Sequence, residues 1–164
     1  MLFRSDAGLG NDKVNGGSGN DVIDVGAGAD VLTGGSGRDL FVFSADSFGE
    51  PTRALKAADR DSLRDFTAGE DQLVFVSFDD NFYGFDGLLP YWDGFVLDPS
   101  AFLAGAGRKV AADADTRLIY DTRSGTLYYD DDGLGGLAAM PVATLVGKPA
   151  LEASDIYIAQ VPAA

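Results

Sequence analysis

The chain has no cysteine and no histidine among its 164 residues. It therefore forms no disulfide bond, has no thiolate or imidazole metal ligand, and offers no cysteine nucleophile. No apolar run of about eighteen residues occurs, so the sequence predicts no membrane-spanning helix. Residues 1–4 lack the apolar stretch of a signal peptide, so export, if it occurs, is expected to use a route without a cleaved N-terminal signal.

Basic residues are scarce. The chain has 12 of them against 26 acidic residues, which gives a formal net charge of -14. This balance argues against nucleic acid as a partner and against docking on an anionic membrane. Nearly all of the acids are aspartate, the exceptions being Glu50, Glu70 and Glu152. Asp and Gly together are typical of turns that direct short carboxylates toward one place.

A nine-residue unit is repeated four times, at 7–15, 16–24, 25–33 and 34–42. An aspartate occupies the sixth position of each unit, as Asp12, Asp21, Asp30 and Asp39. An apolar residue follows two positions later, as Val14, Ile23, Leu32 and Phe41. We expect six residues of turn and three of strand in each unit, with glycine at the second and fourth positions adopting positive φ. Equivalent strands would pair in a parallel roll whose turns alternate between two sides.

The aspartate columns of such a roll would repel one another unless a hard cation lay between the turns. A ligand set made only of oxygens favours Ca²⁺, and Mg²⁺ less well, over transition metals. A flexible Gly/Ser/Asp linker is the alternative for this segment, but a linker has no reason to keep an apolar residue in register. A dinucleotide-binding loop at 26–28 lacks the preceding strand and the third glycine.

The remainder of the chain reads as mostly β. We expect strands at 73–78, 142–146 and 155–159, a hairpin of 117–120 with 126–129, and an acidic turn at 130–136. A short helix is expected at 51–58, and one or two helical turns are expected between Asp98 and Gly105, with Asp98 as N-cap, Pro99 first and Gly105 as the stop. The predicted class is all-β: a short calcium-bound parallel roll at 1–43 and a mostly antiparallel capping region at 44–164, as one continuous domain.

The repeats resemble the C-terminal region of RTX (repeat-in-toxin) proteins: serralysin-type proteases, haemolysin-type toxins and lipases exported by type I secretion. Residues 61–66 and 69–73 resemble the segment that closes the roll in that family, and 119–133 resembles a further element near RTX C-termini. The nonapeptide itself is a known calcium-binding repeat of RTX proteins. The resemblance implies calcium ions, a type I exporter that reads the acidic-then-apolar tail at 155–161, an upstream domain and an extracellular location. That tail is also readable simply as a last core strand.

The resemblance also implies the ligands, namely glycine-loop carbonyls and the sixth-position aspartates. These are Gly8, Gly10, Asp12, Gly16, Gly17, Gly19, Asp21, Gly26, Gly28, Asp30, Gly34, Gly35, Gly37 and Asp39, with Asp46, Asp61 and Asp71 closing the roll. Three residues depart from the pattern: Ala7 and Val25 replace the first glycine of their units, and Lys13 brings a positive charge to the first. Asp65 is readable as a ligand or as a turn-capping residue.

Two further features have open interpretations. Asp130 and Asp132 lie in an Asp-x-Asp-Gly turn that resembles half of an EF-hand loop, and form either a metal site or a hydrogen-bonded turn. The aromatic loop at 79–95, with Tyr91 and Trp92, either binds a ligand or covers a small core.

The sequence favours a non-catalytic calcium-binding module of a larger secreted bacterial protein that folds when it meets calcium outside the cell. One alternative is a secreted enzyme, acting on polysaccharide through paired carboxylates or on protein, which the lack of histidine and of a zinc motif argues against. The other is an adhesion or carbohydrate-binding module that uses the Tyr91–Trp92 loop.

Overall fold

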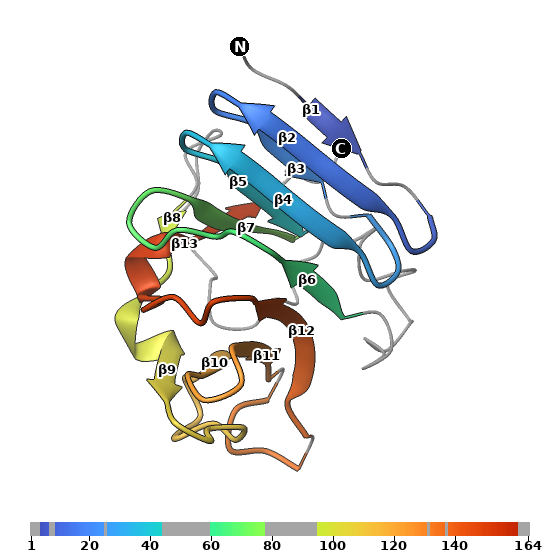
Figure 1. The fold of residues 1–164 in the computed structure, drawn as a ribbon. Helices are drawn as coiled ribbons and strands as arrows, with labels where there is room; N and C mark the ends of the chain where they lie inside the picture. The colour runs from blue at the N-terminus through green and yellow to red at the C-terminus, as the bar shows by residue number, and fades with distance from the viewer. Residues whose placement is uncertain are drawn as a thin grey trace.

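The computed structural model describes residues 4–6, 9–24, 26–43, 60–77, 95–130, 132–136 and 138–160. Gly8, Val25, Asp46, the helix expected at 51–58 and the aromatic loop up to residue 94 lie outside the described residues. Figure 1 shows the fold, with the roll at the top and the capping strands continuing below it.

The repeats form two facing parallel sheets. One sheet contains β1 (Arg4–Asp6), β3 (Val22–Asp24), β5 (Leu40–Phe43) and β7 (Gln72–Ser77) in that order. The other contains β2 (Lys13–Ser18), β4 (Val31–Ser36) and β6 (Asp61–Leu63). Each turn of the repeat carries the chain from one sheet to the other, so the strand that follows β2 in its own sheet is β4. The expected parallel roll is confirmed.

The register explains why one apolar residue per repeat is enough. Val14 pairs with Leu32 in one sheet, and Ile23 pairs with Phe41 in the other. Ile23, Leu32 and Phe41 are completely buried. Because side chains alternate across a strand, the residues on either side of Ile23, Leu32 and Phe41 point away from the core.

The C-terminal region extends both sheets of the roll. Strand β12 (Met140–Leu145) pairs in parallel with β6, and β13 (Ile156–Gln160) pairs in parallel with β7. Beyond them, β12 continues antiparallel to β11 (Thr126–Tyr129), which pairs with β10 (Leu118–Asp121), and β13 pairs with the short β8 (Phe95–Val96). The all-β class is confirmed, as are the hairpin and the three expected strands. The cap is mixed and not mostly antiparallel, because β12, β13 and β9 each have a parallel neighbour.

The helix expected from Asp98 to Gly105 is wrong after its first turn. Asp98 does cap a 3₁₀ turn, η2 (Pro99–Ala101), by accepting a 2.8 Å hydrogen bond from the Ser100 N–H. The chain then becomes strand β9 (Phe102–Gly105), which lies parallel to β10. Pairing with an already formed hairpin satisfies the backbone of this four-residue segment better than one further helical turn would.

One hydrophobic cluster runs through the roll and the cap. It includes Leu32 and Phe41 from the repeats, Leu73 from β7, Leu127 from the hairpin and Ile158 from β13. Within the described residues no helix is long and apolar enough to cross a membrane. The shared core means that the repeats do not bury their apolar column alone.

Candidate metal centre

The turns of the repeats stack on the two edges of the roll. Residues 16–21 lie against 34–39 on one edge, since β2 pairs with β4 from residue 13 to residue 18. The glycines at the second and fourth positions have positive φ, as the repeat pattern predicts: +100° and +108° at Gly17 and Gly19, and +106° and +117° at Gly35 and Gly37. This conformation lets consecutive carbonyl groups point along the stack.

The stacking distance leaves no space for a side chain between turns. A Cβ on Gly35 would collide with the carbonyl oxygen of Gly17, and one on Gly37 with that of Gly19. Carbonyl oxygens of one turn are therefore aimed directly at the backbone of the turn eighteen residues further on. Main-chain oxygens gather on each edge of the roll in consequence.

The aspartates form two hydrogen-bonded columns. Each Asp main-chain N–H donates to a carboxylate Oδ1 of the next coil, at 2.7 to 2.9 Å, in the order Asp12 to Asp30, Asp21 to Asp39, Asp30 to Asp61 and Asp39 to Asp71. Asp61 and Asp71 thus take the place of the next two repeat aspartates, although 31 and 32 residues separate them from their donors. The structure brings together the columns that the sequence predicts and extends them into the closing segment.

The second oxygens divide the carboxylates into two kinds. Oδ2 of Asp30 and Oδ2 of Asp39 are buried and have no hydrogen-bond partner. The Asp39 oxygen lies across its own turn, at the position a Cβ of Gly34 would take. By contrast, Oδ2 of Asp71 accepts a 2.8 Å hydrogen bond from the Thr67 N–H. A buried carboxylate oxygen without a donor is costly unless a cation supplies the missing charge.

Burial and charge act together on these groups. Burial, followed by the charge of neighbouring carboxylates, raises the pKa of Asp30, Asp39 and Asp71 above the ordinary value of 3.8. Hydrogen bonds from the backbone oppose this rise without cancelling it. The columns are therefore electrostatically strained in their ionised form, which is the condition in which a divalent cation contributes most.

Carboxylates alone do not build the site. Within the described ranges, no three acidic side chains come together closely enough to hold a metal ion. An ion on the roll would therefore need the stacked carbonyl oxygens as well as one or two aspartates. Ca²⁺, with six to eight oxygen ligands in flexible geometry, suits such a mixed set.

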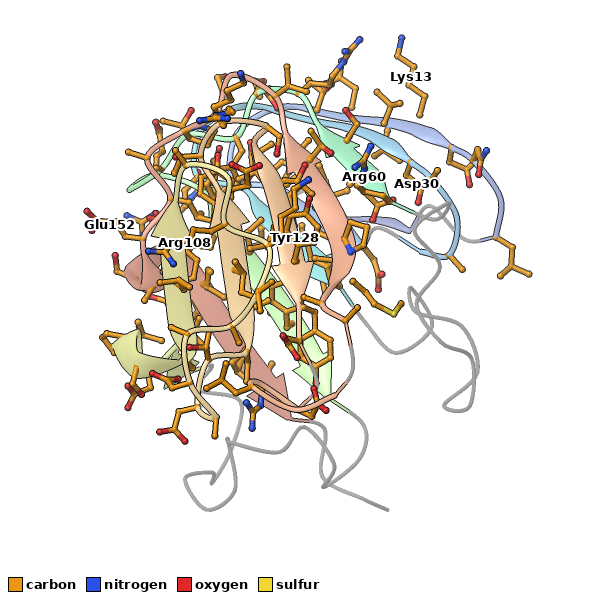
Figure 2. The ribbon with its side chains drawn as sticks, turned by 90° about the horizontal axis from the view of Figure 1, so that it is seen from below. Lys13, Asp30, Arg60, Arg108, Tyr128 and Glu152 are labelled. Atoms are coloured by element: carbon orange, nitrogen blue, oxygen red, sulfur yellow. The ribbon has the colours of Figure 1, made fainter. Side chains whose placement is uncertain are left out.

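Two charged residues near the roll have other roles. Asp65 accepts hydrogen bonds from the N–H groups of Gly34 and Gly35 at 2.9 and 2.8 Å, so its carboxylate caps the last turn on that edge. Lys13 is exposed and projects away from the ribbon in Figure 2, whereas Asp30 lies within the roll. The positive charge of the first repeat therefore leaves the aspartate column undisturbed.

The structure also brings Asp130 and Asp132 together. Asp130 has 2% of its surface exposed, and the Asp132 carboxyl group lies beside its own. Burial first, and then the Asp132 carboxyl, raises the pKa of Asp130. These two residues lie in the turn after β11, outside the repeats.

Two cap aspartates were missed as important groups by sequence reasoning. Asp121 accepts hydrogen bonds from the Gly107 and Arg123 N–H groups and from the Ser124 hydroxyl, and the backbone bonds hold its pKa at about 2. Asp155 joins the Gly69 N–H, at 2.8 Å, to the Glu152 N–H, at 2.9 Å. A local signal existed only for Asp121, since an Asp three residues before a Ser in a Gly-containing turn is typical of an Asx turn.

Comparison with known proteins identifies the repeat. Residues 6–41 match the RTX calcium-binding nonapeptide repeat in four copies. No curated protein sequence matches the chain. A similar solved structure is the solution structure of the AlgE6R3 subunit from the Azotobacter vinelandii mannuronan C5-epimerase, with 20% identity, a TM-score of 0.46, and coverage of 92% of this chain and 78% of that chain.

The family match agrees with the geometry of the same residues: four turns in register, glycines at the positive-φ positions, and two aspartate columns. Calcium is the ion that this repeat binds. Residues 6–41 are therefore a segment of RTX calcium-binding nonapeptide repeats.

Proposed function

We propose that calcium ions bind between turns of the roll that stack eighteen residues apart, and that their binding drives the folding of the whole chain. The observation that supports this most directly is the pair of buried, unbonded Oδ2 atoms of Asp30 and Asp39, each at the edge where main-chain oxygens gather. Ca²⁺ would supply the positive charge that this edge lacks.

The proposed ligands combine carbonyl groups of the turns with the aspartate columns. On one edge they are Gly16, Gly17, Gly19 and Asp21 with Gly34, Gly35, Gly37 and Asp39. On the other they are Gly8, Gly10 and Asp12 with Gly26, Gly28 and Asp30. Asp46, Asp61 and Asp71 are proposed to close the roll. Asp71 uses both oxygens in hydrogen bonds, so it would add an ion contact only through a remaining lone pair.

The energy available from calcium is on the scale of the whole fold. Extracellular calcium modules bind with Kd of about 10⁻⁴ to 10⁻³ M. An ion at a hundred times its Kd stabilises the folded state by about 2.7 kcal/mol. Small domains unfold with about 5 to 15 kcal/mol. Two or more such ions would therefore decide whether the chain, with its net charge of -14, is folded.

We further propose that the chain is a non-catalytic module of a larger secreted protein. It would stay unfolded at low intracellular calcium, pass through a type I exporter, and fold outside the cell beside an upstream domain. The proposed exporter signal at 155–161 overlaps β13, which is paired with β7 in the folded protein. The exporter would have to read it before folding, and low calcium inside the cell would provide that order of events.

Circular dichroism with and without calcium tests the folding proposal. We expect β-structure in 10 mM calcium and its loss in EGTA. The Asp39→Asn variant should need more calcium to fold. Asp98→Asn should behave like the parent chain, since Asp98 is exposed and lies outside the repeats. Identical spectra in calcium and in EGTA would refute the proposal.

Export is tested by expressing the chain with a bacterial type I exporter. Removal of residues 155–164 should abolish its appearance in the medium. Asp39→Asn keeps this tail and should still be exported, but should then be degraded faster by added protease at limiting calcium. Export of the truncated chain at the parent level would refute the role of the tail.

A further inference from the structure

The turn that follows β11 contains a second pair of acidic residues, outside the nonapeptide repeats. Asp130 is the first residue after the strand, and its main-chain N–H donates to the Arg117 carbonyl at 2.8 Å. The position of the Asp130 side chain is therefore set by the hairpin and not by a loose loop. This side chain points inward, with 2% of the residue exposed.

The environment of the Asp130 carboxyl group is only partly satisfied. It accepts hydrogen bonds from the backbone of Asp132 and of Ala111, and it touches the Asp132 carboxyl. Its Oδ1 atom is nevertheless buried without a hydrogen-bond partner. As in the roll, a buried carboxylate oxygen without a donor is costly unless a cation supplies the missing charge.

Main-chain oxygens approach the same turn from the loop at 111–116. Gly133 has a φ of +62°, and the carbonyl oxygens of Asp113 and Ala114 lie 2.7 and 2.8 Å from the position its Cβ would take. The Ala114 oxygen also accepts a 2.6 Å hydrogen bond from Nη1 of Arg117, which leaves the Asp113 oxygen as the better ligand.

The loop is held in this position by its own hydrogen bonds. Oδ1 of Asp113 accepts from the N–H of Thr116 at 2.9 Å and from the Thr116 hydroxyl at 2.8 Å. The Asp113 side chain is thus used to shape the loop, while its carbonyl faces the turn at 132–136. The loop therefore presents main-chain oxygens to the turn at Gly133.

We propose that Asp130 and Asp132 bind a calcium ion together with main-chain oxygens of the 111–116 loop, Asp113 first among them. The ligands are all hard oxygens and bring two negative charges, which suits Ca²⁺. The ion would fasten the turn after the β10–β11 hairpin to the loop that precedes β10. Neither the roll nor the repeat family match, which ends at residue 41, includes this site.

A crystal of the full chain grown with terbium in place of calcium locates the ions directly. We expect an anomalous peak at coordination distance from oxygens of Asp130 and Asp132, in addition to any peaks on the roll. Peaks on the roll without one at this turn would overturn the proposal and leave the roll sites intact.

Counting ions gives an independent measurement. By native mass spectrometry in calcium, Asp130→Asn and Asp132→Asn should each carry one calcium fewer than the parent chain. Asp98→Asn should carry the full number, because Asp98 is exposed and lies outside both the roll and the 111–116 loop. Asp39→Asn should lose an ion from the roll and keep the one at 130–132. An unchanged count in both folded cap variants would overturn the proposal. If Asp130→Asn fails to fold, the ion count of Asp132→Asn, whose parent residue is half-buried, and the terbium peak in the parent chain still test the proposed site.

Discussion

Asp39 of the roll and Asp155 of the cap are both buried, but their carboxylate oxygens are satisfied differently. Asp39 in the roll has one oxygen bonded to a backbone N–H and the other without a partner. Asp155 in the cap has each oxygen bonded to a backbone N–H, from Gly69 and from Glu152. Asp39 therefore leaves a charge for an ion to neutralise, whereas both oxygens of Asp155 are already satisfied by the backbone. Calcium should act directly on the Asp39 carboxylate and reach Asp155 only through the core that the two regions share.

The strongest test of that shared core uses one leucine from each region. Leu32 in the roll and Leu127 in the cap are both completely buried in the same cluster. In calcium, Leu32→Ala and Leu127→Ala should each lower the free energy of unfolding by about 3 kcal/mol, because buried leucine truncations cost about 2.7 to 5 kcal/mol. Urea unfolding followed by circular dichroism measures this.

Both variants should unfold in one transition, in which roll and cap are lost together. Leu9, with 89% of its surface exposed, supplies the control, and Leu9→Ala should change stability by less than about 0.5 kcal/mol. Two separate transitions in Leu32→Ala, with the cap surviving the roll, would show that the two regions fold independently.

A second prediction compares how stability responds when Asp39 of the roll and Asp155 of the cap are each replaced by asparagine. Asp39→Asn should destabilise the protein by about 2 to 3 kcal/mol in excess calcium, because it weakens an ion site. Without calcium the same change should stabilise it, since it removes a buried charge from the column. The calcium-free equilibrium is measured in EGTA with trimethylamine oxide, which favours the folded state.

Asp155→Asn is the matched change in the cap. The NH₂ group of the new asparagine would point at a backbone N–H that donated a hydrogen bond to the carboxylate. The lost hydrogen bond should lower the free energy of unfolding by about 1 to 3 kcal/mol. Since no ion is involved, this loss should be equal with and without calcium. A calcium-dependent effect of Asp155→Asn equal to that of Asp39→Asn would erase the distinction between the regions.

The sequence predicts the roll well because its information is local and repeated. Val14, Leu32 and the turn glycines each sit at a fixed position in a nine-residue unit, so one rule places all of them. The places of Asp61 and Asp71 in the columns are harder to predict, since 31 and 32 residues separate them from the preceding aspartates instead of eighteen. Only the family resemblance indicated their place.

Other features depend on contacts between distant segments. Asp155 bonds to Gly69 across 86 residues, and no local pattern indicates that pairing. Strand β9 was mistaken for a helix because Asp98 and Pro99 are a true start signal, while the hairpin that recruits Phe102–Gly105 as a strand lies more than a dozen residues away. Tertiary pairing overrode a correct local signal.

A smaller effect is expected from pH. In the calcium-free protein the raised pKa values of Asp30, Asp39 and Asp71 mean that the folded state binds more protons than the unfolded chain above the ordinary pKa of 3.8. These three carboxyl groups therefore stabilise the folded state below pH 3.8, and this stabilisation is lost as pH rises through their pKa values in the folded protein. Asp121, with a folded pKa of about 2, contributes above 3.8 and loses its contribution as pH falls toward 2.

Calcium-free stability should therefore be highest near pH 4, where both contributions are present. In excess calcium the maximum should move toward neutral pH, because calcium requires ionised carboxylates. Denaturation curves from pH 3 to pH 8 with calcium and with EGTA measure both maxima. The same optimum in both conditions would contradict the assignment of the roll carboxylates to an ion.

The smallest predicted effect concerns the asparagine ladder on the outer side of the turns. Oδ1 of Asn20 accepts a 3.0 Å hydrogen bond from the Arg38 N–H at an exposed place, and Asn11 does the same for the Ala29 N–H. Asn20→Ala should cost about 0.5 to 1.5 kcal/mol, the ordinary net value of one such bond. Because both oxygens are already bonded to backbone N–H groups, this cost should be the same with and without calcium. The calcium concentration at the midpoint of folding should rise only by the amount that this loss of stability accounts for. A loss of bound ions in Asn20→Ala, counted by native mass spectrometry, would show that the outer ladder also shapes the ion sites.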